Sequence, residues 1–153
     1  MTLEILGAGK AVTELDIRRL EKKISIDFPL DYRSFLLRNN GGRPVKKYFK
    51  IHIKSALVTG KILDFFGIDD PVESCSIEWN YNVYKGRIPS GFFPIGCEDG
   101  GNIICMQYTQ PEPGAVYYWN HDLEGGLVGA GNPQKISGAF DEFLENLTSV
   151  YEG

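Results

Sequence analysis

The sequence predicts a single α+β domain in which helices pack around an antiparallel sheet. Two amphipathic helix patterns come early in the chain, alternating or apolar runs separated by tight turns fill the middle, and one more helix pattern lies near the end. Short connections between successive strands favour an antiparallel meander, because parallel strands need long crossovers. Helices that precede and follow such a sheet are typical of an α+β domain.

The first helix is expected from about Glu14 to Lys23. Thr13 stands at the N-cap position, and Asp16 can return its hydrogen bond three residues later, which is the pattern of a capping box. We expect this helix to bury one apolar stripe and to leave Glu21 on its solvated face. The stripe consists of Leu15, Ile17, Leu20 and Ile24.

A second helix is expected after Phe28, with Pro29 in its first turn, where a missing N–H costs nothing. Its apolar residues recur at helical spacing on one face. They are Phe28, Tyr32, Phe35 and Leu36. Asn40-Gly41-Gly42 should end the helix, and at least one glycine should have a positive φ because the chain must turn before Pro44.

The last helix is expected from about Gly138 to Leu147, with Ser137 as its N-cap. Its apolar stripe consists of Phe140, Phe143, Leu144 and Leu147.

The strand signals lie between these helices. Residues 48–54 alternate apolar and polar side chains, so Phe49, Ile51 and Ile53 should share one face. Two apolar runs flank the turn at residues 98–101, which predicts a hairpin, and residues 115–122 form the next strand. Residues 56–68 could be helix or strand.

Length and composition limit the class of protein. The chain has 153 residues, which suits one domain spanning residues 1–153. With 42% hydrophobic and 24% charged residues it does not have the composition of a disordered chain. No apolar run is long enough to cross a bilayer, and the start of the chain does not look like a secretory signal. We therefore expect a cytoplasmic protein with no membrane partner.

The charges are spread unevenly along the chain. Residues 1–61 carry 13 Lys and Arg against 6 Asp and Glu, whereas residues 62–153 carry 3 against 14. These counts correspond to +7 and −11, which add to the net charge of −4. An acidic surface of this kind suits a basic partner, such as a protein that itself binds nucleic acid.

The cysteines do not indicate a disulfide or a metal. Cys75, Cys97 and Cys105 are odd in number and form no CxxC pair, and the chain has only two histidines. We interpret them as small buried hydrophobic side chains, and we expect neither a metal nor a cofactor.

Three segments in one order resemble the SUKH superfamily, the family of yeast Smi/Knr-type cell-wall regulators and of many bacterial immunity proteins. The segments are FPLDYRSFLLRNNGGRP (residues 28–44), FFPIGCEDGGNIICM (92–106) and AVYYWNHD (115–122). The resemblance covers about 110 residues.

The resemblance implies a sheet of about six antiparallel strands with helices packed around it, and no catalytic residues. It implies an immunity protein that binds and neutralises a cognate toxin. Nucleases are frequent among the toxins that such proteins neutralise. A regulatory protein-binding scaffold of the yeast type is the alternative, and it shares the fold.

Three chemical alternatives are weaker. His121 and Asp122 could form an acid–base pair with Cys105 as nucleophile, but no further catalytic signature accompanies them. The glycine-rich segments GGNI and EGGLVGAGN lack a Walker-type lysine. The basic run is better interpreted as a solvated face than as a nucleic-acid site, because the isoelectric point is near 5.2. That run consists of Arg43, Lys46, Lys47, Lys50 and Lys54.

The candidate binding residues are aromatic side chains close to acidic ones, because aromatic anchors dominate interface energies and acidic rims steer a basic partner. Two groups and one turn residue qualify: Glu78 with Trp79, Tyr81 and Tyr84; Tyr117 and Trp119 with Asp122; and Asp99. Both tryptophans could instead be core residues.

Overall fold

A six-stranded antiparallel sheet forms the centre of the computed structural model, which describes residues 3–124 and 132–151. The strands follow one another in chain order, so each pairs with the next along the sequence. They are β3 (Tyr48–Ile53), β4 (Ala56–Phe65), β5 (Phe92–Glu98), β6 (Ile103–Gln107), β7 (Val116–Trp119) and β8 (Gln134–Ser137). The predicted meander of about six strands is therefore confirmed, and residues 56–68 begin as a strand.

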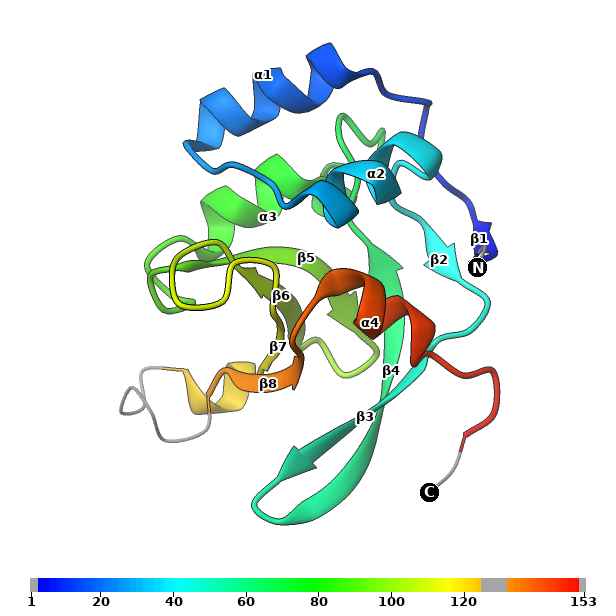
Figure 1. Ribbon diagram of the computed structural model, residues 1–153, viewed down its shortest axis with the longest axis vertical. Coiled ribbons are helices and arrows are strands. Elements are labelled where there is room, and N and C mark those ends of the chain that lie inside the picture. Colours follow the sequence, from blue (N-terminus) through cyan, green and yellow to red (C-terminus); the bar gives the residue numbers. More distant parts are fainter. Residues whose placement is uncertain (1–2, 125–131, 152–153) are drawn as a thin grey trace.

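Helices gather at one end of this sheet and against one side of it, while the hairpin of β3 and β4 extends away from them (Figure 1). The α-helices are α1 (Glu14–Ile24), α2 (Leu30–Arg38), α3 (Ile77–Tyr84) and α4 (Phe140–Glu145). Two 3-10 turns, η1 (Glu73–Cys75) and η2 (His121–Leu123), and a small sheet of β1 (Ile5–Leu6) and β2 (Arg43–Pro44) complete the described fold. None of the helices in residues 3–124 and 132–151 has the length and apolarity that crossing a membrane requires.

The capping box that the sequence predicts for α1 is present. The backbone N–H of Asp16 donates to the Thr13 side chain, and the Asp16 carboxylate accepts from the Thr13 backbone N–H at 2.8 Å. Two side-chain predictions for this helix are wrong. Leu15 is exposed, whereas Glu21 is buried, because its carboxylate accepts the Phe28 N–H at 2.7 Å and pairs with Arg33.

The ends of α2 and α4 test the other helix predictions. Gly41 and Gly42 have φ values of 73° and 109°, which confirms the positive φ expected where α2 stops. The N-cap predicted for α4 is wrong: Ala139 occupies that position, and no side chain caps it. The Ser137 hydroxyl instead accepts from the Ala139 N–H at 3.3 Å, two residues along.

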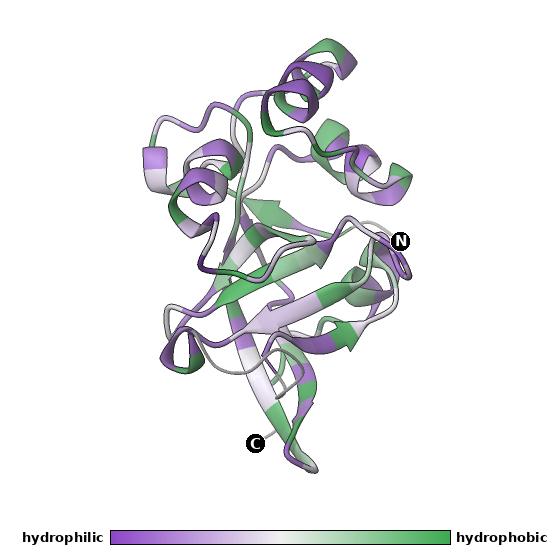
Figure 2. Cartoon of the chain, turned by 90° about the vertical axis from the view of Figure 1, so that its left-hand side faces the viewer, coloured by the Kyte–Doolittle hydropathy of each residue, from purple (hydrophilic) through white to green (hydrophobic). Residues whose placement is uncertain are grey.

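The core lies mainly between the sheet and helices α2 and α4, and it is rich in aromatic rings. Tyr32 of α2 contacts Phe93 of β5 and Phe140 of α4, with ring centroids 5.9 and 5.1 Å apart. Most of the central strands are hydrophobic in Figure 2, whereas the helices carry residues of both kinds. Side chains alternate along β7, so Tyr118 and Trp119 lie on opposite faces of the sheet. Tyr118 contacts Phe49 of β3, and Trp119 contacts Tyr84 of α3. Helix α3 therefore covers the face opposite to α4.

Asn40 connects three parts of the chain that lie far apart in the sequence. It is 3% exposed, and its side-chain amide donates to the Lys10 carbonyl at 2.8 Å and to the Ile68 carbonyl at 2.9 Å. Its side-chain oxygen accepts the Ile68 N–H at 2.7 Å, and its own carbonyl accepts the Gly9 N–H at 2.9 Å. The end of α2 is thereby tied to the segment before α1 and to the segment that follows β4.

The Asn40 contacts predict a large loss of stability in Asn40→Ala. The substitution leaves the buried N–H and carbonyl of Ile68 without partners and removes a part-buried bond to the Lys10 carbonyl, so we expect the free energy of unfolding to fall by about 3 kcal/mol or more. Urea denaturation measures this change. Asn39→Ala is the matched control, because none of the described residues hydrogen-bonds the Asn39 side chain, and it should change stability by less than about 1 kcal/mol. Equal losses in the two variants would contradict the role assigned to Asn40.

Gly41 provides a second stability test. A Cβ atom there would lie 2.8 Å from the Gly67 nitrogen and from the Phe65 carbonyl oxygen. Gly7 has a similar φ of 65° but nothing within 4 Å of such an atom. Both Gly→Ala variants should incur the left-handed strain of about 1–2 kcal/mol. Gly41→Ala should lose about 1–3 kcal/mol more, since backbone must move to admit the methyl group. Thermal unfolding of both variants checks the difference, and Gly7→Ala being the less stable one would refute it.

Candidate functional site

Helix α3 presents side chains on two flanks, each beside a hollow of the surface. Ser76 caps the helix by accepting the Trp79 N–H at 3.2 Å. Ile77 and Asn80 are the buried residues of the helix, and the Asn80 amide donates to the carbonyls of Ser74 and Ser76. This anchoring fixes which residues of α3 reach each flank.

The first hollow, here called the acidic groove, has a volume of about 450 Å³. It combines four carboxylates with one large aromatic ring, and neither Lys nor Arg is among its described lining residues. The groove is lined by Asp69, Asp70, Glu73, Ser76, Glu78, Trp79, Asn82 and Val83. Trp79 is partly exposed, so its ring can meet a partner.

The carboxylates of the acidic groove differ in their surroundings. Lys23 of α1 pairs with Glu78 at 3.1 Å, although both side chains remain partly open to solvent. Asp70 accepts the Val72 N–H at 2.8 Å, which shapes the loop before η1. Within residues 3–124 and 132–151, Asp69 and Glu73 form no ion pair with a cationic side chain. The groove therefore carries a net negative charge.

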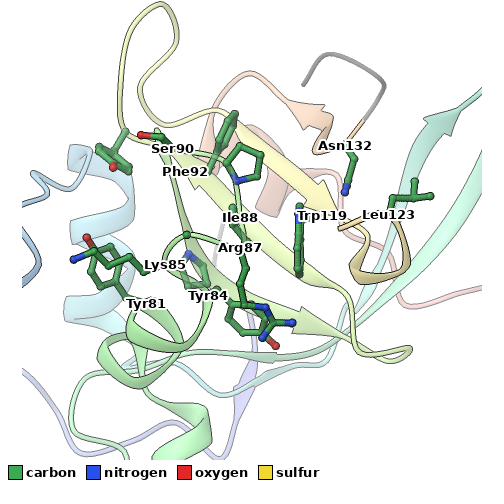
Figure 3. A pocket seen from close by; sticks show the side chains of 14 residues that line it. Tyr81, Tyr84, Lys85, Arg87, Ile88, Ser90, Phe92, Trp119, Leu123 and Asn132 are labelled. Carbon is green, nitrogen blue, oxygen red and sulfur yellow. The ribbon is translucent and has the colours of Figure 1, made fainter. Parts of the chain in front are cut away.

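The second hollow, here called the aromatic cavity, lies on the other flank of α3 and has a volume of about 560 Å³ (Figure 3). Tyr84 meets Trp119 edge to face, with ring centroids 5.7 Å apart. The cavity is lined by Tyr81, Tyr84, Lys85, Gly86, Arg87, Ile88, Pro89, Ser90, Phe92, Pro94, Tyr108, Trp119, Leu123 and Asn132.

Two cations lie at the aromatic cavity. The Arg87 guanidinium lies 4.9 Å from the centre of the Tyr84 ring and donates to both carboxylate oxygens of Glu124, at 3.0 and 2.9 Å. These hydrogen bonds from Arg87 lower the pKa of the Glu124 carboxyl. The Lys85 ammonium lies 5.8 Å from the centre of the Tyr81 ring. Arg87 thus forms an ion pair with the Glu124 carboxylate, whereas Lys85 lies near the face of the Tyr81 ring.

The structure separates the predicted binding residues into groups. Glu78 and Trp79 lie in the acidic groove, and Tyr81 and Tyr84 lie in the aromatic cavity. The sequence left Trp119 open as a binding residue or a core residue, and at 1% exposure it is a core residue that also lines the cavity. The reason is that α3 packs over its ring and leaves it as part of the cavity lining.

Tyr117 lies on the same face of the sheet as Trp119, because side chains alternate along β7. It is half-buried against Phe92, with ring centroids 4.8 Å apart. Tyr117 is therefore next to the cavity but is not among the residues that line it.

Asp99 and Asp122 form a separate acidic end of the molecule, at the β5–β6 turn and at η2. Asn102 links these two segments, because its side-chain oxygen accepts the His121 backbone N–H at 3.0 Å. Asp99 lies 4.0 Å from Lys61, and Asp122 lies 3.3 Å from His121. Each of these carboxylates thus has a basic group beside it, unlike Asp69 and Glu73 in the groove.

The chemical alternatives find little support in the geometry. Cys105 is fully buried, and this burial raises the pKa of its thiol, which leaves it unsuited to act as a nucleophile with His121. Burial also raises the pKa of Cys97 to about 11. The described part of the chain contains no group of three or more His, Cys, Asp or Glu that could hold a metal ion.

The glycine-rich segments do not form a phosphate site in the described residues. In GGNI the Gly100 N–H donates to the Glu98 carboxylate at 2.9 Å, so this backbone donor already binds a carboxylate of the protein. Most of EGGLVGAGN lies outside the described residues. In the basic run, Arg43 is paired with Asp64 at 3.2 Å.

Sequence reasoning missed part of both hollows. Asp69, Asp70 and Glu73 form an acidic stretch just before α3, but the mixed pattern of residues 56–84 concealed that helix. Lys85 and Arg87 are two of only three cations in residues 62–153, and this rarity could have drawn attention to them. Their place beside the aromatic residues depends on the packing of α3 on the sheet.

Comparison with known proteins supports the resemblance found in the sequence. The model of the SMI1/KNR4 family (SUKH-1) matches residues 11–146, which include all four α-helices and the six-stranded sheet. A curated relative is the SPbeta prophage-derived uncharacterized protein YokK of Bacillus subtilis (strain 168), which is 24% identical over 163 residues. That match covers 88% of this chain and 74% of the relative. Because the family match spans far more than half of its length, the chain belongs to the SMI1/KNR4 family (SUKH-1).

Proposed function

We propose that this chain is an immunity protein that binds a toxin protein through the acidic groove and neutralises it without catalysis. The observation that carries the proposal is the groove itself, where four carboxylates and the partly exposed Trp79 line one hollow. A large aromatic ring supplies contact area, and a charged surround steers encounter with an oppositely charged partner. The expected partner is a toxin with a basic face, as in a nuclease.

Physical reasons favour binding over catalysis as the role of this surface. A catalytic site needs a nucleophile or an acid–base pair placed together in a hollow. The described residues that line the acidic groove offer four carboxylates, one hydroxyl, one amide and two apolar side chains, with no His, Cys or Lys among them, so charge and aromatic surface are the main features that a ligand meets there. The carboxylates of the groove attract a basic surface, and Trp79 can then be covered as water leaves the interface.

The first functional prediction concerns protection. Co-expression of this chain with a toxin whose gene is found beside its own should rescue growth, and the two proteins should co-purify. Because protection requires capture of nearly every toxin molecule, we expect a Kd in the nanomolar range or lower. A nanomolar Kd corresponds to a binding free energy of about −12 kcal/mol. If the toxin kills equally with and without this chain and the two do not co-purify, the immunity proposal is wrong. The regulatory scaffold of the yeast type would then be favoured.

The second functional prediction concerns the acidic groove. Glu73→Lys should slow association with the toxin severalfold, and this effect should shrink as salt rises, since exposed charges are screened within about 8–10 Å at ordinary ionic strength. Trp79→Ala should mainly speed dissociation and should cost about 2 kcal/mol or more of binding free energy. Surface plasmon resonance separates the two rates.

The matched control for the charge reversal is Glu145→Lys on α4, which makes the same change in net charge at another exposed position. It should leave the association rate nearly unchanged. Reversals of Asp99 and Asp122 to Lys test the other acidic end. If those two variants slow association and Glu73→Lys does not, the binding face lies at the β5–β6 turn and not at the groove.

A further inference from the structure

The aromatic cavity contains hydrogen-bond donors that the described protein leaves unused. Trp119 is only 1% exposed, and its indole N–H donates to no described residue. The indole nitrogen is nevertheless not completely enclosed by the protein. A buried indole N–H ordinarily finds an acceptor. Tyr81, Tyr84 and Tyr108 also line this cavity, and their hydroxyls make no hydrogen bond with described residues. The site can therefore donate several hydrogen bonds to a ligand.

The rim of the cavity is cationic, although the surrounding part of the chain is acidic. Residues 62–153 contain three Lys and Arg, and two of these, Lys85 and Arg87, are at the cavity. Glu124 neutralises Arg87, whereas no described carboxylate forms an ion pair with Lys85. The charge beside the aromatic lining therefore complements a single negative group on the ligand.

We propose that the aromatic cavity binds an extended, proline-rich peptide segment that carries an acidic side chain. A polyproline II segment offers backbone carbonyls as acceptors and has no internal hydrogen bonds, so it matches the unused indole and phenol donors. Its pyrrolidine rings pack on aromatic side chains, as in other grooves that recognise such segments. The acidic side chain pairs with Lys85.

A nucleotide is the other ligand that aromatic rings and cations could suggest, and the observations favour the peptide. Phosphates are held by several cations or by a cluster of backbone N–H groups. Here Arg87 is already engaged by Glu124, which leaves Lys85 as the one cation at the cavity that the described carboxylates do not pair. Pro89, Pro94 and Ile88 add apolar surface that suits proline rings.

The site differs from the acidic groove, so this proposal does not depend on the proposed function. If the toxin supplies the proline-rich segment, the two hollows bind one partner from both flanks of α3. If another protein supplies it, the cavity is an independent site.

The test uses a blocked polyproline peptide with one central glutamate, titrated into ¹⁵N-labelled protein. The chain has two tryptophans, so Trp79→Phe leaves Trp119 as the source of the single indole N–H signal. That signal should shift with saturation as peptide is added. A peptide with alanine in place of the prolines and a peptide with lysine in place of the glutamate should both bind at least several times more weakly.

Two variants locate the binding. Tyr81→Ala should weaken peptide binding about tenfold or more, which corresponds to about 1.4 kcal/mol. Lys85→Gln should weaken it about twofold to fivefold, as expected for an exposed ion pair. Thermal unfolding of each variant shows whether it is folded, and Lys85→Gln is a surface change that should leave the fold intact.

The proposal is overturned if the Trp119 signal shows no saturable shift at millimolar peptide, or if the alanine peptide or the lysine peptide binds as well as the original. It is also overturned if a nucleoside triphosphate shifts the signal at lower concentration than the peptide does. Toxin binding measured on Tyr81→Ala and Lys85→Gln with Trp79 retained separates the two proposals, because failure of peptide binding with intact toxin binding leaves the immunity proposal standing.

Discussion

The hydrogen bonds of Asn40 determine where the elements around it can lie. One buried amide satisfies backbone groups on the segment before α1 and on the segment after β4, and its own backbone carbonyl accepts a third bond, from Gly9. Gly41 and Gly67 pass so close to neighbouring backbone that neither has room for a Cβ atom. Because residues 66–68 lead into η1 and α3, the position of α3 over the sheet follows from this junction.

The position of α3 then decides the chemistry of the surface. One flank of the helix adds Glu78 and Trp79 to the carboxylates of the preceding loop, while the other places Tyr81 and Tyr84 beside Trp119. An acidic hollow and an aromatic hollow with a cationic rim are thereby separated by a single helix. No described residue lines both hollows, so the two proposed ligands contact different side chains.

Much of the fold could be predicted because its signals are local. The capping box of α1 depends on residues three positions apart, and the stop of α2 depends on adjacent glycines. The hairpin of β5 and β6 follows from two apolar runs around a short turn. One prediction failed because the partner came from elsewhere in the chain. Glu21 looked like a surface residue, but Arg33 and the Phe28 N–H hold its carboxylate in the interior.

The sequence by itself determined the order of most elements and much of the apolar core, because periodicity, caps and turns are properties of neighbouring residues. The family followed from the resemblance of three segments, which the family match over residues 11–146 supports. The sequence also placed four of the residues at the two hollows, Glu78, Trp79, Tyr81 and Tyr84, in one short segment. Only the tertiary structure decided which of them meet Asp69 and Glu73 and which meet Trp119 and Lys85. The physical reason is that charge and aromatic surface are sorted by the packing of α3 on the sheet, which depends on contacts between segments distant in the chain.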